Sequence, residues 1–192
     1  MRFLAFAISL LTMASLSASA ATMTFEGFAS PGTWSDATSG YLEAGFKVAG
    51  SSLTIVDSGG APDMVGNDSD YAMFDPHAKG ITLTAVSGAS FQLSDLMIGP
   101  STHPLPVFPV TFTLQGTQVG GGMLSASFSG LTTSTLATLN WQNLSSVKIL
   151  ASSNSIMVGM DNINATIVPE PAGAVLALSM VFAAIRHRRR LV

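Results

Sequence analysis

The chain of 192 residues contains no cysteine. In a protein that is exported, this absence excludes a disulfide scaffold, thiolate metal ligands and a cysteine nucleophile. Charged residues are also scarce, at 10% of the chain, and the interior has no long apolar segment of helical period. The interior is therefore expected to be stabilised by an apolar core that is not helical, with or without a bound cation.

Basic side chains are nearly missing between residues 21 and 168. This span carries ten carboxylates against three lysines, a net charge of −7, whereas the formal charge of the whole chain is only −3. An acidic domain therefore lies between two basic ends. Because nucleic-acid binding depends on Lys and Arg neutralising phosphates, the composition argues against a nucleic-acid partner. It suits divalent cations or neutral sugars.

Histidines and catalytic motifs are equally scarce. His77 and His103 are the only histidines of this span, and neither belongs to an HExxH or a G-x-S-x-G motif. The pattern predicts a protein that is not an enzyme. A secreted carbohydrate-active enzyme remains an alternative, since the two carboxylates of a glycoside hydrolase are defined by their separation in space.

The amino end has the parts of a secretory signal peptide. Met1 and Arg2 form a short positive region, residues 3–16 are apolar, and Ala18-Ser19-Ala20 provides small residues for cleavage. We expect a signal-peptide helix over residues 1–20, with a cut after Ala20.

The carboxyl end combines three different parts. Pro169, Glu170 and Pro171 precede an apolar run at residues 172–185, and a basic cluster follows. As a helix the run would rise about 21 Å, which is short for a hydrocarbon core of about 30 Å. The arginines of this cluster cannot easily cross the membrane and would stay on the cytoplasmic side. The chain before Val168 would then be exported. The cluster consists of Arg186, His187, Arg188, Arg189 and Arg190.

This order of parts resembles the PEP-CTERM sorting signal of Gram-negative bacteria, which is the tag of exosortase substrates. The resemblance covers residues 169–192 and implies recognition by an exosortase in the inner membrane, processing near Pro169-Glu170-Pro171 and delivery to the cell surface or the exopolysaccharide matrix. The arginines Arg186, Arg188, Arg189 and Arg190 would retain the tail in the membrane until then. The alternative is a plain C-terminal membrane anchor, which is usually longer.

Residues 21–168 have the size of one domain and a strand-like pattern. Apolar and polar residues alternate along 81–84, 91–94 and 110–115, as in half-buried strands. Further strands are expected at 23–25, 46–48, 53–56, 71–74, 123–128, 136–141, 147–151, 156–160 and 163–168, and a proline-rich loop at 99–106. About a dozen short strands separated by turn residues predict an all-β, antiparallel sandwich.

The same span resembles the galactose-binding-like jelly rolls that are common among carbohydrate-binding modules. The resemblance rests on TFEGF at 24–28, EAGFKV at 43–48, FQL at 91–93, TLQG at 113–116 and MDNI at 160–163. It implies a jelly-roll β-sandwich. In many such modules a structural calcium joins the first and last strands through carboxylates that correspond to Glu26 and Asp161, with further oxygens from Asn162 or from residues near Glu43.

Two interpretations of Glu26 and Asp161 stay open: calcium ligands, or residues that sit in turns at the sandwich edges. Asp68-Ser69-Asp70 also has the spacing of a cation-binding turn, and an ordinary solvated turn is its alternative. Trp34 lies in a loop context and is the best candidate for stacking on a sugar ring, with packing over the sandwich end as its alternative. Trp141 is expected in the core.

The predicted protein is exported, sorted by an exosortase and held at the surface or in the polysaccharide matrix, with a structural or weak glycan-binding role. The alternatives are the secreted carbohydrate-active enzyme and a calcium-dependent adhesion module.

Overall fold

The computed structural model describes residues 19–30, 32–57, 69–101, 108–154 and 157–168, which form one compact unit, Ser19–Val168. Its strands are β1 (Ser19–Met23), β2 (Trp34–Asp36), β3 (Tyr41–Glu43), β4 (Phe46–Ala49), β5 (Thr54–Val56), β6 (Tyr71–Phe74), β7 (Ile81–Ala85), β8 (Phe91–Pro100), β9 (Val110–Gln118), β10 (Met123–Leu131), β11 (Thr135–Ser153) and β12 (Val158–Ile167). All strand pairs are antiparallel. The all-β prediction is confirmed for this part of the chain.

The two chain ends lie outside the described residues. They carry residues 1–18 of the predicted signal-peptide helix, the Pro-Glu-Pro motif, the C-terminal membrane helix and the arginine cluster, and these remain predictions. The last two residues of the predicted helix, Ser19 and Ala20, are not helical, because they pair with β12 as the start of β1. A search of the described ranges finds no helix long and apolar enough to span a bilayer.

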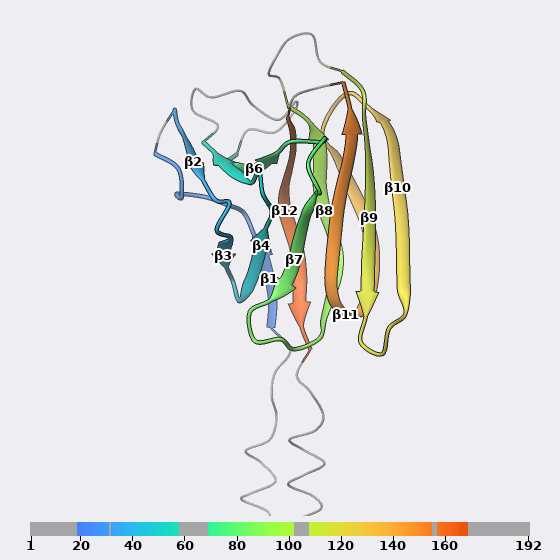
Figure 1. Ribbon diagram of the computed structural model, residues 1–192. Helices are drawn as coiled ribbons and strands as arrows, with labels where there is room; N and C mark the ends of the chain where they lie inside the picture. Colours follow the sequence, from blue (N-terminus) through green and yellow to red (C-terminus); the bar gives the residue numbers. More distant parts are fainter. Residues whose placement is uncertain (1–18, 31, 58–68, 102–107, 155–156, 169–192) are drawn as a thin grey trace, which may run out of the picture. The chain divides into compact units, whose positions relative to one another are not determined.

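The strands form two layers that share β11 (Figure 1). The first layer has the order β2-β5-β6-β12-β8 and ends on the first half of β11, with β1 alongside β12. The second layer has the order β3-β4-β7, then the second half of β11, then β9 and β10. The predicted β-sandwich is therefore present, although continuous hydrogen bonding through β11 joins its layers into one sheet.

The core lies between these layers because every second side chain of the strands points inward. Buried and partly exposed residues alternate strictly along β7 and over most of β9, as the sequence pattern predicts. Two aromatic contacts join the layers. Phe46 of β4 meets Phe91 of β8 with ring centroids 5.5 Å apart, and Phe74 of β6 meets Phe112 of β9 at 6.3 Å.

β11 passes from one layer to the other through a series of bulges. It pairs with β8 over residues 135–144 and with β9 over residues 144–153. The register shifts twice against β8, and Asn140 and Asn143 adopt positive φ values of 52° and 57°. Bulges bend a strand and increase its twist, and asparagine tolerates this backbone region better than most residues. The sequence predicted separate strands at 136–141 and 147–151; that separation is wrong, because the interruption is a bend within one strand.

β12 has a similar bulge at Asn162, whose φ is 47°. Before it, residues 158–160 pair with β6; after it, residues 163–167 pair with β1. The strands predicted at 156–160 and 163–168 are therefore one strand. The loop predicted from Gly99 also begins later, since β8 continues through Pro100.

Candidate functional site

The segment that follows β1 is held by one carboxylate of β3. Glu43 accepts hydrogen bonds from the backbone N–H groups of Thr24 and Phe25, both at 3.1 Å, and from the Tyr41 hydroxyl at 3.0 Å. Phe25 is fully buried and has a φ of 62°, which is uncommon for a bulky residue. Glu43 therefore stabilises a backbone turn that would otherwise be strained.

A second carboxylate, that of Asp70, also binds this segment. The Gly27 N–H donates to Asp70 Oδ2 at 3.0 Å, and Asp70 is only 4% exposed. The preceding residue, Ser69, donates its hydroxyl to Asp161 Oδ2 at 2.6 Å. Residues 69–70 thus connect the turn after β1 to the bulge of β12.

Asp161 is fully buried and is bonded to its own bulge. Asn162 donates its backbone N–H to Oδ1 at 2.6 Å and its side-chain amide to Oδ2 at 2.9 Å. With Ser69, the carboxylate accepts three hydrogen bonds, which matches the need of a buried charge for partners. The Asp161 carboxylate therefore stabilises the bulge at which β12 changes its pairing partner, and we call Asp161 the structural centre of this region.

The two predicted calcium ligands differ in environment, because Glu26 is exposed and Asp161 is buried. Within the described ranges no three His, Cys, Asp or Glu side chains are arranged to hold a metal. Three donors already point at the Asp161 carboxylate, so calcium would have to share its remaining lone pairs and take other oxygens from backbone or water. The hydrogen bonds of Asp161 indicate a structural role, and calcium binding by Glu26 and Asp161 remains a prediction.

The environment of this region raises the pKa of the Tyr41 phenol. Burial is the largest effect that raises the pKa of its phenol, followed by the negative charge of Glu43 and the hydrogen bond to it. The charges of Asp70 and Glu26 raise this pKa further. Three carboxylates therefore lie close enough to act on one hydroxyl, which favours its neutral form.

This shift predicts a loss of stability in alkali. The pKa of the Tyr41 phenol is higher in the folded than in the unfolded chain, where it is about 10, so the folded state binds more protons above that pH. The free energy of unfolding should fall as the pH rises above about 10, and less steeply in a Tyr41→Phe variant. Urea unfolding between about pH 8 and about pH 11 measures both slopes. Equal slopes would show that Tyr41 is not the titrating group.

Three of the remaining acidic and histidine candidates, Asp70, Asp75 and His77, lie in the part of the chain that the structure describes. Asp68 and His103 lie outside the described residues, and Asp70 is bonded to Gly27. Asp75 accepts the backbone N–H of His77 at 2.7 Å, and His77 is exposed, as expected for a surface turn. These contacts indicate turn formation at Asp75.

The two tryptophans are exposed to different degrees. Trp34 is 63% exposed and begins β2, the edge strand of the first layer, where it pairs with Val56. Trp141 packs against the core over Gly116, where an added Cβ would lie 2.9 Å from the indole. Trp34 therefore offers most of an aromatic surface to solvent, whereas Trp141 is half-buried.

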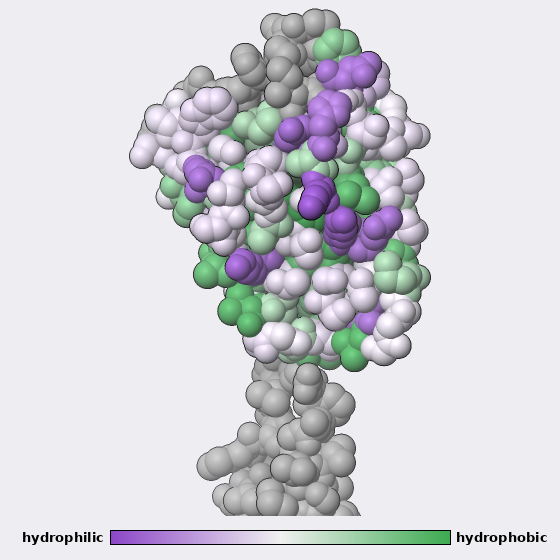
Figure 2. Space-filling model, in the orientation of Figure 1, coloured by the Kyte–Doolittle hydropathy of each residue, from purple (hydrophilic) through white to green (hydrophobic). Residues whose placement is uncertain are grey.

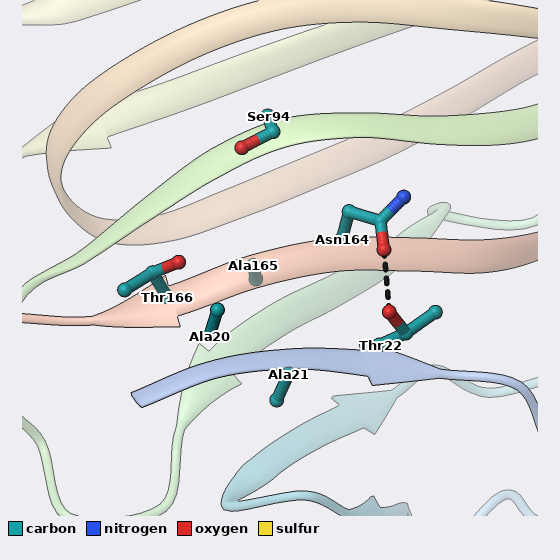
Figure 3. Close-up of a pocket in the computed structure, with 7 residues that line it drawn as sticks. All are labelled: Ala20, Ala21, Thr22, Ser94, Asn164, Ala165 and Thr166. Carbon is teal, nitrogen blue, oxygen red and sulfur yellow. Dashed lines mark hydrogen bonds between the residues drawn. The ribbon is translucent and has the colours of Figure 1, made fainter. Parts of the chain in front are cut away.

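A shallow depression of about 180 Å³ lies between β1, β8 and β12 (Figure 3). It is lined by Ala20, Ala21, Thr22, Ser94, Asn164, Ala165 and Thr166. Thr22 Oγ1 donates to Asn164 Oδ1 at 2.5 Å, and Asn164 donates its amide to Asp95 at 2.6 Å. Ligand pockets usually measure about 300–1,000 Å³, so this depression is small for a sugar. Two of its polar side chains, Thr22 and Asn164, also bond to each other.

No family model and no curated protein matches the sequence. Among solved structures, the chain is similar to the tandem CBM22 domains of Paenibacillus barcinonensis Xyn10C, with 10% identity and a TM-score of 0.39 over 82% of this chain and 48% of that one. It thus spans about half the length of the tandem.

Two single modules are similar at the same level. The C-terminal family 22 carbohydrate-binding module of Clostridium thermocellum Xyn10B has 13% identity and a TM-score of 0.37, over 78% of this chain and 95% of that one. TmCBM61, solved with β-1,4-galactotriose, has 10% identity and a TM-score of 0.34, over 65% and 90%. These values are too low to assign this chain a family or a ligand.

Proposed function

We propose that the protein is an exported, exosortase-sorted component of the cell surface or exopolysaccharide matrix. It is not an enzyme, its domain is a galactose-binding-like jelly roll, and its role is structural with weak glycan contacts. The observation that carries the proposal is the position of Pro169-Glu170-Pro171, which begins two residues after β12 ends at Ile167. Processing near this motif would leave every strand of the sandwich in place.

The arrangement of the first and last strands supports the same proposal. Ser19 of β1 pairs with Ile167 of β12, so the domain begins and ends at one place. The predicted cut after Ala20 would remove the first two residues of β1 and leave three residue pairs, from Ala21 with Ala165 to Met23 with Ile163. Both processing steps would then act at one end of the sandwich and away from its core.

Trp34 is the residue we propose for glycan contact. Its ring is the largest exposed aromatic surface among the described residues, and the acidic domain suits neutral sugars better than anionic ones. One exposed aromatic residue supplies a limited contact area, which is consistent with weak binding. A bound calcium also remains part of this proposal, with Glu26 and Asp161 as its ligands.

A Trp34→Ala variant should therefore bind the glycan more weakly and keep the stability of the wild type. We expect an affinity for neutral surface polysaccharide about tenfold lower than that of the wild type, equivalent to about 1.4 kcal/mol, and an unchanged melting temperature. Isothermal titration calorimetry measures the affinity. Leu42→Ala is the matched control, because Leu42 is 62% exposed on β3, at the edge of the other layer.

Two results would reject this part of the proposal. Equal binding by the Trp34→Ala and Leu42→Ala proteins would remove Trp34 from the glycan site. Hydrolysis of the polysaccharide that is abolished by replacing one Asp or Glu would show the secreted enzyme instead.

A further inference from the structure

The charges of the domain are distributed very unevenly. No Asp, Glu, Lys or Arg occurs between Asp95 and Lys148. This segment supplies β9, β10 and the first half of β11, which together form one side of the sandwich. Figure 2 shows this side at the right, where the surface over β10 is mainly white and pale green rather than purple. One edge of an acidic domain is thus free of charged side chains.

β10 is the outermost strand of this side (Figure 1). It is nine residues long, and β9 is its only partner among the described strands. The edge strands β2 and β3 at the opposite ends of the two layers have only three residues each and carry Asp36 and Glu43. β10 is therefore the longest outermost strand of the second layer.

Proteins normally protect such strands from pairing with other chains by means of charge, proline, shortness or bulges. β10 has no charged residue and no proline. Its one protective feature is a register shift between Phe128 and Leu131, where Gly130 has a φ of 70°. Residues 123–128 pair regularly with β9, so their outer backbone groups form a regular row that another strand can pair with.

We propose that β10 pairs with β10 of a second copy of this chain. The two strands would run antiparallel about a twofold axis, which makes the second layers of both copies one continuous sheet. A backbone-paired edge of this kind is a small interface, and the expected association is reversible.

The side-chain pattern of β10 is compatible with itself. Leu124, Ala126 and Phe128 are partly buried, whereas Ser125 and Ser127 are exposed on the other face. An antiparallel pair centred on residue 125, 126 or 127 places the face of Leu124, Ala126 and Phe128 opposite the same face of the partner, because directly opposed residues share a face. The face that carries Ser125 and Ser127, together with Met123, is likewise opposite itself. Two copies of β10 can therefore pair while every side chain stays on the face of the sheet that it has in the single chain.

Charge favours this edge over the other edges of the domain. Two copies with a net charge of −7 over residues 21–168 repel one another wherever their carboxylates face each other. Strands β9, β10 and β11 contain no carboxylate, and their one charged residue is Lys148 of β11, which lies opposite Gln115 of β9. Association through β10 therefore keeps the carboxylates of both copies apart from the contact.

Sedimentation velocity of the full chain in detergent micelles, over a range of concentrations, tests the proposal. The wild type should form a dimer, and S125K/S127K should raise the dissociation constant about tenfold or more by opposing like charges. V86K/S87K adds the same charge at two exposed positions of the turn after β7 and should leave the dissociation constant unchanged. Melting curves confirm that each variant is folded.

Cross-linking provides a second readout, because the native chain has no cysteine. Ser125→Cys and Ser127→Cys, separately and mixed in equal amounts, should give a disulfide-linked dimer in at least one of the three reactions, since opposed residues lie within disulfide distance. Thr82→Cys should not. A monomeric wild type, a dimer unaffected by S125K/S127K, or cross-linking no greater than that of Thr82→Cys would overturn the proposal.

Discussion

Replacing Asp161 with alanine is expected to lower the free energy of unfolding by about 3–5 kcal/mol. The carboxylate is fully buried and accepts hydrogen bonds from the Ser69 hydroxyl and from two N–H groups of Asn162. Without it, these donors lose their acceptor in a place that water reaches poorly, and each lost partner costs about 1–3 kcal/mol. The effect should be large because the same residues maintain the bulge of β12.

Urea unfolding of the Asp161→Ala protein measures this loss. Glu26→Ala is the control, because Glu26 is exposed and its replacement should change stability by no more than about 0.5 kcal/mol. Each protein is melted with calcium and with a chelator. If calcium binds Asp161, the chelator lowers the melting temperature of the wild type but not that of Asp161→Ala. A loss below about 1 kcal/mol in Asp161→Ala would show that Asp161 is not the structural centre inferred from its hydrogen bonds.

Phe46→Ala should destabilise the sandwich by a similar amount, about 3–5 kcal/mol. Phe46 is fully buried, and its ring meets Phe91 edge-on at an interplanar angle of 77°, so it joins β4 of one layer to β8 of the other. Alanine would lose this contact and leave a cavity between layers that are fixed by their own hydrogen bonds. The neighbouring strands cannot easily move inward to fill it.

Chemical unfolding also measures the Phe46→Ala effect, and Phe28→Ala is the comparison. Phe28 has an edge-on contact with Tyr41 at 5.1 Å but remains 47% exposed, so its loss should cost clearly less. Equal losses in the two variants would mean that burial between the layers does not determine stability.

The sequence predicts the strands best where alternation is longest. β7, β9 and most of the core follow the period-two pattern because one face of each strand is buried. β2 and β3 are not predicted, since three residues at an edge give too short a pattern to recognise. β11 and β12 are divided wrongly, because asparagine and aspartate within a bulge resemble the residues of a turn.

The site could be predicted only in part. Position in the chain identifies Glu26 and Asp161, but their different burial depends on packing between distant segments. The bond from Gly27 to Asp70 crosses 43 residues, and that from Ser69 to Asp161 crosses 92. Glu43 binds the turn after β1 through the N–H groups of Thr24 and Phe25, whereas the jelly-roll resemblance implies only that residues near Glu43 supply further calcium oxygens. Local patterns do not contain such long-range pairings.

The proposed delivery of the domain to the surface depends on a removable tail. Mass spectrometry of the protein recovered from its native host, with and without the exosortase, tests it directly. We expect a chain that ends near Pro169-Glu170-Pro171 when the exosortase is present and a chain that retains residues 172–192 when it is absent. An intact tail in both strains would rule out sorting by the exosortase and leave a plain membrane anchor.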